Sequence, residues 1–210
     1  MMIYHHQILG VILAGGQSQR MNYNPKWRLI LQQQTVIEHI IDKFAPQVSQ
    51  VIINGSHPLL EKLPYPVICD SLTGGMGPLA GILTGLEYAQ QQGFAWLATC
   101  PCDTPFLPNS YVDILANAIA KTDSTNTTGA IVKSGDHIHG VFGLWSVKLA
   151  VQLRRLLETK DVRSIRQWTQ KDAHTLTVEI VEEKNAFFNI NTPKDWQRAQ
   201  SIYIHSHHNK

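Results

Sequence analysis

The 210-residue sequence predicts an α/β fold in which a mostly parallel sheet lies between two layers of helices. Short apolar runs, bounded by glycine, proline or polar residues, alternate with longer segments whose apolar residues recur at helical spacing. This alternation is typical of strand–helix–strand units, whose strands pair in parallel. No internal repeat or linker interrupts it. We therefore expect one domain over residues 1–204, followed by a polar, disordered tail over residues 205–210.

The individual elements follow from apolar spacing and from helix and turn signals. Residues 8–13 form an uninterrupted apolar run, as expected of a strand that is buried on both faces. Thr35 suits the N-cap of a helix that ends before Pro46. Pro78 suits the first turn of another helix, which Gly93 would terminate. The other predicted strands are residues 48–54, 67–69, 94–100, 130–133, 141–145, 175–181 and 187–190, and the other predicted helices are residues 111–121, 147–158, 162–170 and 193–202.

The composition argues against several classes of protein. Charged residues make up 16% of the chain and the formal net charge is +2, without the basic stripe of a nucleic-acid-binding surface. No apolar run approaches the roughly 20 residues that span a bilayer, and we expect no signal peptide. Three cysteines are too few for a disulfide framework. We therefore expect reduced, packed thiols and a cytoplasmic protein without membrane or nucleic-acid partners.

The turn after the first predicted strand is a candidate ligand site, because ligands of parallel sheets bind at the carboxyl ends of the strands. Gly15 and Gly16 have no side chains, so their backbone N–H groups can approach a phosphate or a base edge. Arg20 and Lys26 add the positive charge that a triphosphate and a leaving pyrophosphate require. The alternative is a glycine-containing turn with two solvated cations.

Two acidic residues follow other predicted strands. Asp103 comes after residues 94–100, and a carboxylate there suits Mg²⁺ whose other ligands are phosphate and water oxygens. Asp70 precedes a glycine-rich loop and a helix N-terminus, so it can accept a hydrogen bond from a ribose or a base. The alternatives are a helix cap or turn for Asp103 and a turn residue for Asp70.

Two asparagines near the end of the chain are further candidates. Asn189 and Asn191 face the same side of an extended chain, where their amides can bind a polar heterocycle. Thr192, before a proline, is typical of a helix cap.

Arg163 and His139 are weaker candidates. Arg163 can bind a ligand phosphate, whereas a solvated helix face is at least an equal interpretation for Arg166. His139 lies just before a predicted strand.

Together these segments resemble the molybdenum cofactor guanylyltransferase family. The matching motifs occur in the family's order and spacing, and they extend over residues 8 to about 200. They are LAGG-x-S-x-RM from Leu13, Asn54 at the end of the second strand, DS-x₅-GPLAG from Asp70, PCDTP around Asp103 and NxNTP from Asn189. Each motif is modest alone, and their ordered conjunction is specific.

The resemblance implies a three-layer nucleotide-binding (Rossmann-like) nucleotidyltransferase fold with a mostly parallel sheet. It implies an enzyme that transfers GMP from MgGTP to molybdopterin, or to its molybdenum form, and releases pyrophosphate. Mg²⁺ would be the cofactor. Proteins that deliver and accept the molybdenum cofactor would be transient partners.

The resemblance also assigns roles to individual residues. Lys26 would lie at the phosphates and Asp103 would hold Mg²⁺. With Arg20, whose charge lies near the same loop, they are the predicted catalytic residues. The nucleotide-binding residues would be Leu13, Ala14, Gly15, Gly16, Lys26, Asn54, Asp70 and Asp103. The pterin-facing residues would be Asn189, Asn191, Arg163 and His139.

The segment before and after Lys26 departs from the family's pattern. The family usually has a glycine after Arg-Met and an aspartate before the lysine, whereas this chain has Asn22-Tyr23-Asn24-Pro25 and then Trp27-Arg28 after the lysine. Pro25-Lys26 is instead similar to sugar nucleotidyltransferases, although the second glycine of LAGG favours guanine. Two alternatives stay open: a cytidylyl- or sugar-phosphate nucleotidyltransferase, and a noncatalytic nucleotide- or cofactor-binding carrier.

Overall fold

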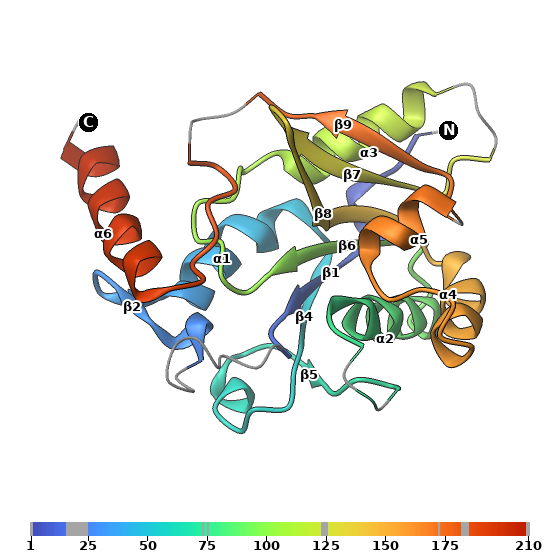
Figure 1. Cartoon of the computed structure of the whole chain (residues 1–210), viewed down its shortest axis with the longest axis horizontal. Coiled ribbons are helices and arrows are strands. Elements are labelled where there is room, and N and C mark those ends of the chain that lie inside the picture. Colours follow the sequence, from blue (N-terminus) through green and yellow to red (C-terminus); the bar gives the residue numbers. More distant parts are fainter. Residues whose placement is uncertain are drawn as a thin grey trace.

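The computed structural model describes residues 2–15, 25–72, 74, 76–122, 126–171, 173–181 and 185–208. Its centre is a seven-stranded sheet in the order β5-β4-β1-β6-β8-β7-β9, and β2 and β3 form a separate hairpin (Figure 1). The strands are β1 (Ile8–Leu13), β2 (Ile30–Leu31), β3 (Gln34–Thr35), β4 (Gln50–Asn54), β5 (Val67–Ile68), β6 (Trp96–Pro101), β7 (Gly129–Ser134), β8 (His137–Ser146) and β9 (Thr175–Glu179).

In the described residues, α-helices and short 3₁₀ helices lie before, between and after these strands. The α-helices are α1 (Val36–Phe44), α2 (Pro78–Gln91), α3 (Tyr111–Lys121), α4 (Leu149–Glu158), α5 (Ile165–Lys171) and α6 (Pro193–His208). The 3₁₀ helices are η1 (His5–Gln7), η3 (Lys26–Arg28), η4 (Ala45–Gln47) and η5 (Leu60–Lys62). Thr35 caps α1 as predicted: its Oγ1 accepts a hydrogen bond from the Glu38 N–H, and Glu38 Oε2 accepts one from the Thr35 N–H.

The sheet is mostly parallel, as the sequence predicts. Strands β5, β4, β1 and β6 pair in parallel, and so do β7 and β9, whereas β8 pairs antiparallel with both β6 and β7. Because His137 at the start of β8 pairs with Ser134 at the end of β7, the first residues of β8 lie at the carboxyl edge of the parallel strands. The carboxyl edge, where ligands of parallel sheets bind, therefore includes the ends of β4, β1, β6 and β7.

Helices cover both faces of the sheet and explain why β1 is buried throughout. Ile8 and Ile12 of β1 pack with α1 and α3 on one face. Leu9, Val11 and Leu13 pack with α2, α4 and α5 on the other (Figure 1). This alternation is the period-2 pattern of a strand between two apolar layers, and the three-layer α/β prediction is confirmed.

The structure corrects the sequence prediction at the end of the chain. Residues 187–190 form no strand among the described residues, and residues 185–187 form a turn instead. Helix α6 continues to His208 rather than ending at Ile202, so the expected tail boundary at His205 lies inside this helix. Along the described ranges, none of the helices combines the length and apolar character needed to cross a bilayer.

Candidate functional site

The ends of β4, β1 and β6 lie side by side and bring the predicted nucleotide-binding residues together. The Ala14 N–H donates to the Asn54 carbonyl at 2.7 Å, and the Cys102 N–H donates to the Leu13 carbonyl at 3.2 Å. Leu13 and Ala14 are buried, whereas Gly15 is exposed at the edge of the sheet. Gly16 and Arg20, which the sequence analysis assigned to the same site, lie outside the described residues.

Lys26 bridges two segments that are remote in the sequence. Its Nζ donates to Asp103 Oδ2 at 2.9 Å and to Asn191 Oδ1 at 2.6 Å, across sequence separations of 77 and 165 residues. The ion pair is largely withdrawn from solvent, with side-chain exposures of 19% for Lys26 and 13% for Asp103. Phosphate-binding and metal-binding candidates therefore meet at a single point.

The second carboxylate oxygen of Asp103, Oδ1, is buried and has no hydrogen-bond partner among the described residues. Burial raises the pKa of the Asp103 carboxyl above its ordinary value, although the Lys26 ammonium counteracts part of this shift. A buried, unpartnered carboxylate oxygen is costly unless a donor or a cation meets it. Asp103 therefore has the coordination capacity that a divalent cation would use.

In the described residues, acidic, histidine and cysteine side chains do not by themselves complete a metal site at Asp103. Within the described ranges, no group of three or more such side chains could hold a metal ion. Any metal at Asp103 would therefore need ligands from a substrate and from water, as is usual for Mg²⁺ bound with nucleotide phosphates.

Trp27 anchors the short helix η3, which carries Lys26. The Trp27 side chain is buried in the core that includes α1, and its ring meets His57 edge-on at a centroid distance of 5.4 Å. The Val36 N–H also donates to the Leu29 carbonyl, which ties the end of this segment to α1. The bulky Trp27 that departs from the family's pattern therefore fits, and it fixes the backbone next to Lys26.

The N-terminus of α6 orients Asn191. Asp195 Oδ2 accepts hydrogen bonds from the N–H groups of Asn191 and Thr192 at 3.1 and 2.9 Å, and from the Thr192 hydroxyl at 2.9 Å. The Thr192 hydroxyl accepts from the Asp195 N–H in return, so the capping role predicted for Thr192 is confirmed. The Ile190 N–H donates to the Asp103 carbonyl at 2.9 Å. Helix capping and strand-end pairing thus bring Asn191 to Lys26.

Asn54 and Asp70 are joined to each other. Asn54 Nδ2 donates to Asp70 Oδ1 at 2.9 Å and to the Ile68 carbonyl at 3.2 Å. Gly81 of α2 leaves the space for this amide, because a Cβ there would collide with Asn54 Oδ1. The close helix approach explains why the GPLAG segment needs its second glycine.

A second layer of contacts holds the segment after Asp70, and the sequence analysis missed it. The Ser71 N–H donates to Thr84 Oγ1 at 2.9 Å, and Arg154 Nη2 donates to the Ser71 hydroxyl at 3.3 Å. Arg154 also pairs with Glu87 of α2. The sequence could have indicated Thr84, because it is a polar residue within the apolar stripe of α2. No local pattern predicts the pair between Arg154 and Glu87.

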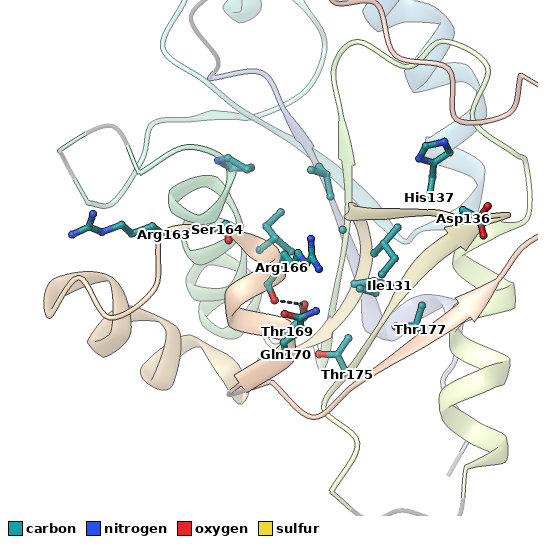
Figure 2. A pocket seen from close by; sticks show the side chains of 15 residues that line it. Ile131, Asp136, His137, Arg163, Ser164, Arg166, Thr169, Gln170, Thr175 and Thr177 are labelled. Carbon is teal, nitrogen blue, oxygen red and sulfur yellow. Dashed lines mark hydrogen bonds between the residues drawn. The ribbon is translucent and has the colours of Figure 1, made fainter.

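A pocket of about 730 Å³ lies beside this site, between α5 and the strands β7, β8 and β9 (Figure 2). Pro78 at the N-terminus of α2 lines it, and so does Arg163. The pocket is therefore adjacent to the helix start that follows the Asp70 loop. Its volume is that of a small-molecule site.

The four predicted pterin-facing residues do not lie together. Arg163 lines the pocket, Asn191 contacts Lys26, and Asn189 is exposed. His139 packs on Phe187 with ring centroids 4.8 Å apart, within the cluster on the α1 and α3 face, and its Nε2 lies 2.8 Å from the Ser134 hydroxyl. Burial lowers the pKa of His139 below its ordinary value.

We predict that Asp195→Ala loosens Lys26 although the two side chains do not touch. Loss of the carboxylate removes three hydrogen bonds that fix residues 191 and 192, and it costs about 1 kcal/mol of helix capping. Mass spectrometry after brief amine acylation should give faster labelling of Lys26 in this variant. Asp195→Glu, which retains a capping box, should restore slow labelling. Asp113→Ala, in the first turn of α3, is the matched control. Equal Lys26 labelling in all four proteins would contradict the prediction.

Comparison with known proteins identifies the family. A model of the MobA-like NTP transferase domain matches residues 10–175. A molybdenum cofactor guanylyltransferase of Haemophilus influenzae is 36% identical over 194 residues, which cover 91% of this chain and 97% of the relative. That of Mesorhizobium japonicum is 36% identical over 209 residues, covering 93% and 95%.

A solved structure supports the same fold. The molybdopterin-guanine dinucleotide biosynthesis protein A of Archaeoglobus fulgidus superposes with a TM-score of 0.75 at 23% identity, covering 94% of this chain and 99% of that one. The family model and the relatives both extend over most of the chain, including the edge where Lys26 meets Asp103. The chain is therefore a nucleotidyltransferase that belongs to the family of the molybdenum cofactor guanylyltransferases, which are MobA-like NTP transferases.

Proposed function

We propose that this nucleotidyltransferase transfers GMP from GTP to molybdopterin, or to its molybdenum form, and releases pyrophosphate. The observation that carries the proposal is the Lys26–Asp103 pair at the carboxyl edge of the sheet, with a buried carboxylate oxygen left unpartnered. The guanylyltransferase names of its relatives support guanine as the base and the molybdenum cofactor as the acceptor.

The nucleotide would lie across the ends of β1 and β4. The exposed Gly15 backbone is suited to a base edge or a phosphate, because no side chain blocks its approach. Asp70, held by Asn54, has a carboxylate that can accept from a ribose hydroxyl or a base N–H. Gly16 and Arg20 are proposed for the same site from the sequence alone.

Asp103 would hold Mg²⁺ together with oxygens of the triphosphate. The fit rests on two features of Asp103: Oδ1 is buried without a partner, and burial raises the pKa of the carboxyl. A dication would give Oδ1 a partner and would lower this pKa by favouring the charged carboxylate. Bound Mg²⁺ supplies neutralisation of phosphate charge.

The transfer itself needs little covalent participation by the protein. A terminal phosphate oxygen of the acceptor forms a bond to the α-phosphorus as the bond to the pyrophosphate oxygen breaks, and pyrophosphate carries away the electron pair. Lys26 counters the charge that develops on the phosphates, and its fixed position lowers the cost of orientation. The acceptor phosphate is already largely ionised near neutral pH, so no protein base is required.

The acceptor heterocycle would occupy the pocket between α5 and the strands β7, β8 and β9. Its position next to Pro78 connects it to the Asp70 loop, where the nucleotide would lie. Arg163 at this pocket, Asn191 at Lys26 and the exposed Asn189 are proposed to meet acceptor groups. His139 has no part in this assignment, because its ring already packs on Phe187 and meets the Ser134 hydroxyl.

We predict that GTP stabilises the folded protein more than CTP, UTP or ATP when each is added with Mg²⁺. A nucleotide at a hundredfold excess over its Kd adds about 2.7 kcal/mol, or roughly 5–10 °C in Tm for a domain of this size. Thermal unfolding with each nucleotide measures the preference. A larger shift with CTP would favour a cytidylyltransferase, and a larger shift with UTP would favour a sugar-phosphate nucleotidyltransferase.

We predict that Asp103→Ala lowers pyrophosphate release from GTP and molybdopterin at least about a hundredfold, because a site for phosphate charge stabilisation is lost. Release is measured at saturating MgGTP, with thermal unfolding of the variant as a check on folding. Asp113→Ala removes an exposed carboxylate from the first turn of α3 and should retain wild-type release. Near-normal release by Asp103→Ala would reject the metal assignment. A wild-type protein that binds GTP but releases no pyrophosphate would favour the noncatalytic carrier.

A further inference from the structure

Arg166, for which the sequence favoured a solvated helix face at least equally, is exposed and lines the pocket beside α5. Figure 2 shows the Arg166 side chain between α5 and Ile131, whereas Arg163 extends in the opposite direction. Arg163 and Arg166 both line the pocket, and their side chains extend in different directions from this segment.

Packing fixes the face that α5 presents. Ile165 and Trp168 are buried, and Trp168 stacks on Trp145 with ring centroids 4.8 Å apart. Gly140 of β8 allows this close approach, because a Cβ there would lie 3.0 Å from Ile165 Cγ2. With these anchors in place, residues 166, 169 and 170 form one stripe at spacings of three and four, and all three line the pocket. The packing of Ile165 and Trp168 therefore places the exposed side chain of Arg166 on the face of α5 that lines the pocket.

The guanidinium of Arg166 has no ion-pair partner in the part of the chain that the structure describes. In contrast, Arg154 of α4 pairs with Glu87 and Glu158. The acidic side chain that lines the pocket is Asp136, in the β7–β8 turn. An unpaired guanidinium over a pocket is available to a ligand.

The pocket floor suits a flat, polar ring system. Ile131 supplies an apolar surface, and Thr175 and Thr177 alternate along β9 so that both line the pocket. A guanidinium can stack on a planar heterocycle or donate two parallel N–H groups to its carbonyl and ring nitrogen. A lysine ammonium provides neither geometry.

We propose that Arg166 is a specificity-determining residue that binds the fused nitrogen heterocycle of the acceptor in this pocket. The inference rests on the proposed function for the identity of the acceptor. Its physical basis is an exposed guanidinium, without an ion-pair partner among the described residues, that lines the same pocket as Ile131, Thr175 and Thr177.

The test uses pterin-6-carboxylate as a fluorescent probe of the full-length protein. Its binding should weaken about tenfold or more in Arg166→Met, and Arg166→Lys should not restore it. Arg155→Met, which removes an exposed arginine of α4 outside the pocket, is the matched control and should bind as wild type does. If Arg166→Met does not fold, Arg166→Gln takes its place in the binding measurement. Thermal unfolding of each variant shows whether it is folded.

The kinetic counterpart separates acceptor binding from nucleotide binding. The KM for molybdopterin should rise in Arg166→Met, whereas the Tm shift caused by MgGTP should match that of wild type. Equal probe binding by Arg166→Met and Arg155→Met, or no probe binding by wild type, overturns the role of Arg166. Wild-type protein that releases no pyrophosphate, while Arg166→Met still loses the probe, overturns the proposed function and leaves the role of Arg166 standing.

Discussion

The ion pair between Lys26 and Asp103 is the interaction on which the site depends. It joins the segment after β1 to the end of β6, and the hydrogen bond from Lys26 to Asn191 adds the start of α6. A buried carboxylate is strongly disfavoured without a partner, so each of these segments constrains the others. The same pair carries the two charges that a metal–triphosphate would need, which is why structure and chemistry coincide at this edge.

The sheet makes this convergence possible. Parallel strands end at a common edge, and the pairing of β1 with β4 and β6 aligns Leu13 with Asn54 and Pro101. The residues that follow these strands are then neighbours whatever their separation in the sequence. Antiparallel β8 extends this edge toward β7, so the pocket beside α5 opens near the same edge. The proposed nucleotide and acceptor sites thus share one sheet.

The sequence predicted secondary-structure elements correctly where the signals for them are local. The limits of β1 and α3 and the cap of α1 were predicted as observed, because apolar runs, helical spacing and Thr35 report directly on backbone structure. The sequence did not predict the elements whose structure depends on tertiary contacts. The β2–β3 hairpin has two-residue strands, too short for periodicity. Residues 187–190 pair through Ile190 with the Asp103 carbonyl rather than within a strand.

The sequence could indicate that the candidate residues lie at one edge, although their roles stay predictions. Asn54, Asp70 and Asp103 lie at or just after the ends of β4, β5 and β6, and the ends of parallel strands meet at the same edge of a sheet. Side-chain direction was not predictable for Arg163 and Arg166, since it depends on how Ile165 and Trp168 seat α5 against the sheet. The contact between Lys26 and Asn191 was also not predictable from the sequence. It forms only when the cap of α6, the end of β6 and η3 are all in place. Local pattern therefore determines which groups are available, and packing determines which of them act on one ligand.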